Sequence, residues 1–116
     1  MGNDISVLRG QSYSREFTIA KEDGTAFDLT GQTVNFRLFD ELPDTPLLSY
    51  TSAANPTKVV IVGAATAGKV RIDLAPSDTD RAAAPYVYVL FAVDGAGKKT
   101  PFVWPTTFYV SEGGLT

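Results

Sequence analysis

The chain has 116 residues, of which 44% are hydrophobic and 20% charged, enough for one globular domain and too few for two ordinary ones. Its net charge of −3 argues against sequence-independent binding of nucleic acid, which needs a basic surface. Because cysteine and histidine are both absent, a disulfide framework, a thiolate metal site and a Ser-His-Asp triad are excluded. We therefore expect one domain over residues 1–116, no enzymatic activity, no cofactor and no metal. No apolar run approaches the ~20 residues of a membrane span, so no membrane partner is expected either.

The dominant sequence period is two, which is typical of strands with one buried face. The apolar residues Val34, Phe36 and Leu38, for example, alternate with the polar residues Asn35 and Arg37. Turn signals such as Asp23-Gly24 separate the alternating runs. The pattern predicts strands over Ile5–Arg9, Tyr13–Ala20, Thr33–Asp40, Leu47–Thr51, Lys58–Val62, Lys69–Leu74, Tyr86–Asp94 and Phe102–Val110.

Short strands joined by glycine- and proline-containing turns are typical of an antiparallel sandwich or barrel. The sequence therefore predicts an all-β protein, an antiparallel β-sandwich of about seven to eight strands. Pro105 falls inside the last predicted strand and cannot donate a backbone hydrogen bond, so an edge position or a bulge is expected there.

The stretch "LAPSDTDRAAAPYVY" carries two aspartates between two prolines. Ser77 can cap a short helix, and Asp78 and Asp80 then lie near its positive end. Pro85 ends the helical segment, so one helical turn is predicted near residues 77–83. The alternative is a cation site built from the two aspartates, although the glycine and glutamate of an EF-hand loop are missing.

Tyr86 directly follows this corner. In immunoglobulin-like sandwiches a tyrosine near the start of the sixth strand donates a hydrogen bond back to the corner backbone. The spacing here fits that device, so Tyr86 is predicted to be a corner tyrosine and the sandwich to be immunoglobulin-like. Catalysis by Asp78 and Asp80 is the weaker interpretation, since no third polar group of the usual kind lies nearby in sequence.

The strand Tyr86–Asp94 is apolar on both faces, whereas a strand of a two-layer sandwich should show one face to water. Either loop residues or the 39–51 segment cover the second face, or another subunit does, because large apolar patches usually mark interfaces. Phe39 lies on the outward phase of its own strand and favours the second alternative. The predicted interface residues are Phe39, Val87, Val89, Phe91 and Val93.

Several stretches carry a family likeness: "RGQSYSREFTI", "DGTAFDLTGQTVNFRLFD", "TPLLSYTS", "GKVRIDLAPSDTDRAAAPYVYVLFAVDGAGKKT" and "TTFYV". From about Ile5 to Val110 the chain resembles an immunoglobulin-like β-sandwich of tailed-bacteriophage virion proteins, similar to the N-terminal domain of phage baseplate upper proteins. The matching positions are Gly10, Phe17, Asp23-Gly24, Asp28-Leu29-Thr30-Gly31, Val34, Phe36, Pro46-Leu47, Gly68, Val70, Leu74, Pro76, Asp78-Thr79, Tyr86 and Tyr88.

The resemblance implies a non-enzymatic structural protein of the virion, made in the bacterial cytoplasm. Its implied partners are other virion proteins, with further copies of the same chain as one possibility. A single module of this kind suits a head decoration protein, a neck component, or an accessory component of the tail or baseplate. The alternative function is a carbohydrate- or host-surface-binding module of a phage tail, for which Trp104, Tyr109 and Tyr50 could serve as aromatic contacts.

Overall fold

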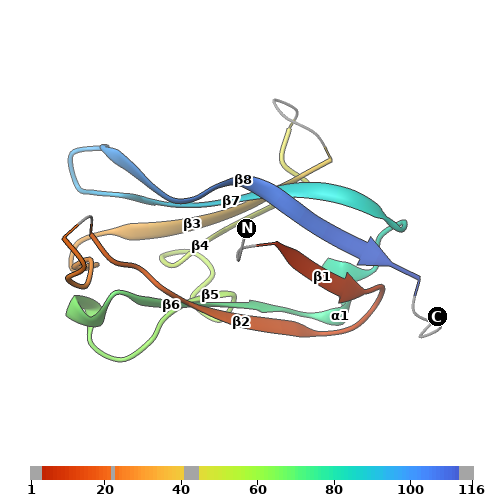
Figure 1. Ribbon diagram of the computed structural model, residues 1–116, viewed down its shortest axis with the longest axis horizontal. Helices are drawn as coiled ribbons and strands as arrows, with labels where there is room; N and C mark the ends of the chain where they lie inside the picture. The colour runs from red at the N-terminus through yellow and green to blue at the C-terminus, as the bar shows by residue number, and fades with distance from the viewer. Residues whose placement is uncertain (1–3, 22, 41–44, 113–116) are drawn as a thin grey trace.

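The computed structural model describes residues 4–21, 23–40 and 45–112, without the side chain of Trp104, and shows a mostly β protein with one short helix. Two layers of strands lie one over the other, and the helix sits at one end of them (Figure 1). The elements in chain order are β1 (Ile5–Leu8), β2 (Tyr13–Thr18), β3 (Thr33–Phe39), β4 (Leu48–Thr51), β5 (Val59–Ile61), η1 (Ala65–Ala67), β6 (Lys69–Leu74), α1 (Pro76–Thr79), β7 (Ala84–Val93) and β8 (Lys99–Ser111).

The larger sheet has the strand order β1-β8-β7-β3-β4, and the smaller one has the order β2-β6-β5. The smaller sheet is antiparallel throughout, but β1 pairs with β8 in parallel, with Ile5 opposite Phe108. The prediction of a purely antiparallel fold is therefore wrong, and the larger sheet is mixed. Alternation of buried and exposed residues is the same in parallel and antiparallel strands, so it carries no information on strand direction.

The core lies between the two sheets and consists mainly of the residues that the alternation places inward, together with Leu29 from the connection between β2 and β3. In β6, Val70, Ile72 and Leu74 are buried while the residues between them are not. The fully buried rings of Phe36 and Tyr88 belong to the facing sheet and have centroids 5.8 Å apart. The predicted inward phase is confirmed for these strands, because one face of each must leave water to form the core.

Pro105 lies at an irregular stretch of β8. Tyr88 pairs with Thr106 and Leu90 with Val103, so the register shifts between them. β1 pairs only with residues 108–111 of β8, so the earlier part of β8 is also an edge. Pro105 thus lies both at a bulge and at a sheet edge, the two settings expected for it. A proline fits there because neither setting requires the backbone N–H that proline lacks.

The helix at the corner is shorter than the predicted turn over 77–83 and starts earlier. It spans Pro76–Thr79 with Ala75 as its N-cap, so Ser77 lies inside the helix and does not cap it. The prediction for Ser77 is wrong because proline is well suited to the first helical position. Pro85 does not end the helix but lies in β7 opposite Tyr109.

Candidate functional site

The outward face of β7 is where the structure places most of the predicted interface residues. Along β7 the inward residues are buried, and Val87, Val89, Phe91 and Val93 between them are only partly buried. β3 pairs with β7 in register, so Phe39 lies opposite Val87 and extends the same face. We call the outward side chains of β3, β7 and the first part of β8 the outer face.

Phe39 shares the direction of the outer face but adds almost no accessible area to it, because it is only 7% exposed. The sequence left open whether the 39–51 segment covers the outer face. Residues 48–51 of that segment form β4, which continues the sheet beside β3. Leu47 just before β4 is 41% exposed, and residues 41–44 lie outside the described residues. The described part of that segment therefore widens the sheet and does not cover β7.

Two cations of the outer face, Arg37 and Lys99, were not among the interface residues predicted from the sequence. The Arg37 guanidinium carbon lies 5.1 Å from the centroid of the Phe91 ring, and Lys99 Nζ lies 5.8 Å from it. Arg37 is opposite Val89 and Lys99 is opposite Val93. Arg37 and Phe39 are two residues apart in one strand and so point to the same face. The position of Arg37 on the outer face was therefore predictable from the sequence. Placing Lys99 needed the register of the β7–β8 hairpin.

The acidic corner holds a buried carboxylate and not a pair of equivalent aspartates. Asp78 is 5% exposed and accepts hydrogen bonds from the Tyr50 hydroxyl, from Lys58 Nζ at 2.7 Å and from the Ala75 backbone N–H at 2.8 Å. Lys58 thereby makes an ion pair with it, although the Lys58 side chain is 26% exposed. Sequence reasoning missed Tyr50 and Lys58, which precede Asp78 by 28 and 20 residues.

These contacts shift the pKa values of Asp78 and Tyr50 in opposite directions. Burial alone would raise the pKa of the Asp78 carboxyl, but the hydrogen bonds from Lys58, Tyr50 and Ala75 outweigh burial and lower it below its ordinary 3.8. Burial first, and the hydrogen bond to Asp78 second, raise the pKa of Tyr50 to about 12. Asp78 therefore remains ionised and Tyr50 neutral at physiological pH, which is the arrangement that stabilises the corner.

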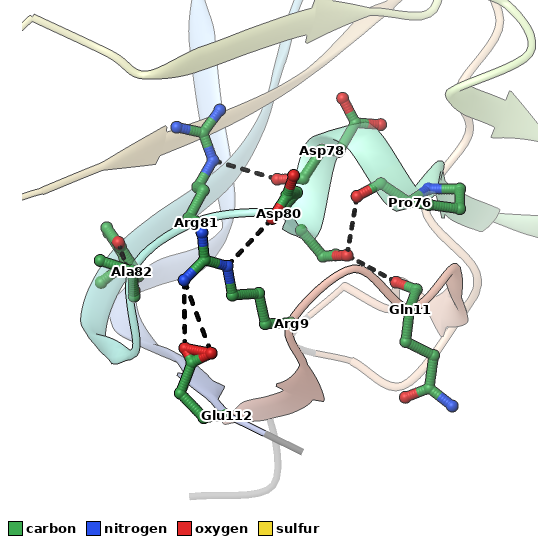
Figure 2. A network of polar contacts seen from close by, with 10 residues as sticks. Arg9, Gln11, Pro76, Asp78, Asp80, Arg81, Ala82 and Glu112 are labelled. Atoms are coloured by element: carbon green, nitrogen blue, oxygen red, sulfur yellow. Dashed lines mark hydrogen bonds and ion pairs between the residues drawn. The ribbon is translucent and has the colours of Figure 1, made fainter. Parts of the chain in front are cut away.

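Asp80 is exposed and takes part in a separate network (Figure 2). Arg9 Nε donates to Asp80 at 2.9 Å, while Arg9 Nη1 lies 3.1 Å from Glu112. The Thr79 hydroxyl donates to the Gln11 carbonyl at 2.6 Å. The chain's first and last strands are thus joined to the corner by side-chain contacts. Because Asp78 and Asp80 serve different partners, the structure does not bring them together as a pair of ligands.

Tyr86 is buried at the start of β7, and its hydroxyl donates to the Ala82 carbonyl at 2.7 Å. This is the contact that the sequence predicts for a corner tyrosine. Arg81 Nε also donates to the Asp78 carbonyl at 3.0 Å, so side chains satisfy backbone groups that the short helix leaves unpaired. The tyrosine and the arginine therefore hold the bent connection between α1 and β7.

A Tyr86→Phe variant is expected to lower the free energy of unfolding by about 1 kcal/mol, because it leaves the Ala82 carbonyl without its donor. Thermal denaturation followed by circular dichroism checks this. The matched control is Tyr109→Phe, since Tyr109 is 45% exposed. Equal melting temperatures for wild type and Tyr86→Phe would contradict a role for the hydroxyl in holding the corner.

A hollow of about 630 Å³ opens between residues 15–21, which form part of β2 and the turn after it, and residues 100–103 of β8. Phe27 and Phe102 meet at its wall edge to face, with ring centroids 5.1 Å apart. β2 is an edge strand of its sheet, and this part of β8 lies beyond its pairing with β1. The hollow thus follows from the topology, because two sheet edges face each other without a strand between them.

No protein-family model and no curated protein matches this chain. Among residues 4–21, 23–40 and 45–112, no group of three or more acidic side chains is placed so that it could hold a metal ion. Within the same described residues, no helix has the length and apolar character needed to cross a membrane.

Proposed function

We propose that this chain is a non-enzymatic structural protein of a bacteriophage particle that binds other virion subunits through the outer face. Head decoration, the neck, and an accessory position in the tail or baseplate are the places in the particle that the proposal covers. The observation that carries it is the partly buried apolar row of Val87, Val89 and Phe91 in a strand whose other face already fills the core. Such a row becomes fully desolvated when a partner covers it.

The finer part of the proposal is that the fold is an immunoglobulin-like sandwich. Variable-type domains of that class place strands B, E and D in one sheet and G, F, C and C′ in the other. The orders β2-β6-β5 and β8-β7-β3-β4 correspond to this arrangement when strands are matched in chain order. The hydrogen bond from Tyr86 to Ala82, at the turn from β6 to β7, supports the same assignment.

Two further features support a role in assembly. The chain has no histidine and no cysteine, the side chains on which many catalytic and metal sites depend. The resemblance to phage virion modules covers most of the chain and concerns proteins that act by binding neighbours. Peptide mass analysis of purified virions tests the proposal directly. We expect the chain to be present, and its absence from every particle would reject a virion role.

A Val89→Asp variant is expected to reduce incorporation into particles by at least tenfold while leaving the fold intact. The new carboxylate would lie opposite Arg37 in the middle of the outer face, where a partner would have to desolvate it. Incorporation is measured by quantitative mass spectrometry of particles assembled with each variant, and folding by circular dichroism of the purified chain.

Val60→Asp is the matched control, because Val60 is a partly buried valine of β5 in the other sheet. We expect it to be incorporated as well as wild type. Equal incorporation of Val89→Asp and wild type would show that the outer face is not the surface used in assembly.

For the alternative of glycan binding, the structure describes the side chains of two of the three aromatic residues that the sequence suggests, Tyr50 and Tyr109. Tyr50 uses its hydroxyl in the bond to Asp78, whereas Tyr109 is exposed on β8. The side chain of Trp104 lies outside the described part of the chain. Binding of the isolated chain on a glycan array, lost in a Tyr109→Ala variant, would favour this alternative over subunit binding.

A further inference from the structure

Phe91 on the outer face has a cation on each side. Arg37 reaches it from β3 and Lys99 from β8, both within the range of a cation–π contact. These contacts hold two positive charges over an apolar surface, on a chain whose net charge is −3. The outer face is thus locally basic although the protein as a whole is acidic.

The two cations differ from three other basic residues in lacking an acidic partner. Arg9, Lys58 and Arg71 each pair with a carboxylate, whereas no ion pair of Arg37 or Lys99 is present among the described residues. Arg37 Nε is also shielded from solvent and has no hydrogen-bond acceptor in the described structure. Because Nε is shielded, an oxygen supplied from outside the chain would have to bind the terminal NH groups of the guanidinium, for which the described structure shows no acceptor either.

A groove of about 310 Å³ runs beside these cations, and the rest of its wall is apolar. Val89, Phe91 and Val103 contribute to the wall together with Pro101 and Pro105. The two prolines have no backbone N–H, so a segment lying there gains little by adding as a strand to this part of β8. A segment bound in the groove would therefore be recognised through its side chains, an acidic one at the two cations and apolar ones along the rest of the wall.

We infer that this groove binds an aspartate or glutamate side chain flanked by apolar residues, presented by a different protein of the particle. The inference rests on the proposed function and names the chemistry of its partner. A guanidinium binds a carboxylate through charge-assisted hydrogen bonds, and Lys99 adds a second positive charge at the same site. Two cations in an apolar groove do not suit a nucleic acid, whose binding needs many basic contacts.

A second copy of the chain is a poorer occupant. A two-fold contact centred on the groove would place the same patch of each copy against the other. Arg37 and Lys99 of both copies would then face one another, and like charges across an interface are repulsive. The favoured occupant is therefore a different chain with an acidic side chain.

The test uses the full chain and a library of randomised eight-residue peptides displayed on yeast. We expect wild type to enrich peptides with a glutamate or aspartate next to apolar residues. In calorimetric titration the best synthetic peptide should bind at least tenfold more tightly than its version with glutamine in place of the acid. An Arg37→Glu variant should lose the acidic preference and enrich lysine or arginine at the same position.

Lys69→Glu makes the same change of charge on β6 of the other sheet and should leave the preference unchanged. Thermal denaturation establishes that each variant is folded, and Lys99→Glu, at an exposed position, repeats the test if Arg37→Glu is unfolded. Absence of acidic enrichment with wild type, or its equal loss with Lys69→Glu, would overturn the inference. Self-association of wild type that Arg37→Glu abolishes, without acidic enrichment, would identify a second copy as the occupant and overturn it as well.

The outcome is separable from that of the proposed function. If the chain is found in virions but selects no acidic peptides, the carboxylate site is wrong and the virion role stands. If the chain selects acidic peptides through Arg37 but is absent from every particle, the groove is a binding site and the virion role is wrong.

Discussion

An Asp78→Ala variant is expected to lose about 3 kcal/mol of the free energy of unfolding, with the melting temperature lowered by about 10–15 °C. The substitution leaves Lys58, Tyr50 and the Ala75 N–H without their shared acceptor. Removing one partner of a buried pair typically costs about 3–5 kcal/mol, and the lower end applies because Lys58 retains some contact with water. Chemical denaturation at neutral pH measures the difference.

The loss should also depend on pH. The pKa of the Asp78 carboxyl is lowered in the folded chain, so its stabilisation is complete above the ordinary value of 3.8. It disappears as the pH falls through the lower pKa of the folded state. The difference between wild type and variant should be constant above about pH 5 and shrink below about pH 4.

Asp80→Ala is the matched control, because Asp80 belongs to the same corner but its side chain is 59% exposed. Surface ion pairs contribute little, so this variant should unfold close to wild type. If both variants unfold alike, the buried contacts of Asp78 do not stabilise the corner.

A Gly68→Ala variant is expected to be destabilised by about 3–4 kcal/mol or to fail to fold at 37 °C. Gly68 has φ +67°, and a β-carbon placed there would lie 2.6 Å from the Ile19 carbonyl oxygen and 2.9 Å from that of Phe27. These oxygens belong to backbone, and Ile19 itself donates to the Gly68 carbonyl at 2.7 Å. Relief of the clash would therefore separate the end of β2 from the start of β6.

Gly63→Ala separates the two causes of this loss. Gly63 has the same φ of +67°, but its β-carbon would meet no atom within 4 Å. It should cost about 1 kcal/mol, the conformational penalty alone. Melting temperatures of the two variants measure the difference, and equal values would show that the contact with Ile19 and Phe27 is tolerated.

The strands of the core and the composition of the outer face were predictable because both depend on a local period. Val70, Ile72 and Leu74 alternate with polar residues in the sequence and are buried in the structure. The same period places Val87, Val89 and Phe91 on one face of β7, where they are partly buried. Side chains in a strand point alternately to its two sides, whatever the strand pairs with.

The corner was predicted only in outline. A turn between two strands and a contact from Tyr86 to its backbone follow from residues that are close in sequence. The side-chain partners of Asp78, Tyr50 and Lys58, lie in the β4–β5 region, and nothing local to the aspartate indicates them. The helix boundaries were misplaced because Ala75 and Pro76, not Ser77, occupy the cap and the first helical position.

By itself the sequence determined that this protein is built from strands, which apolar side chains share one face of a strand, and that no histidine or cysteine is present. Only the tertiary structure decided that β1 runs parallel to β8, that Asp78 is buried against Lys58, and that Arg37 and Lys99 meet at Phe91. The physical reason is the separation along the sequence over which each effect acts. Alternation and turn chemistry act over a few residues, whereas sheet order, ion pairing and the grouping of charges depend on which distant segments the core brings together.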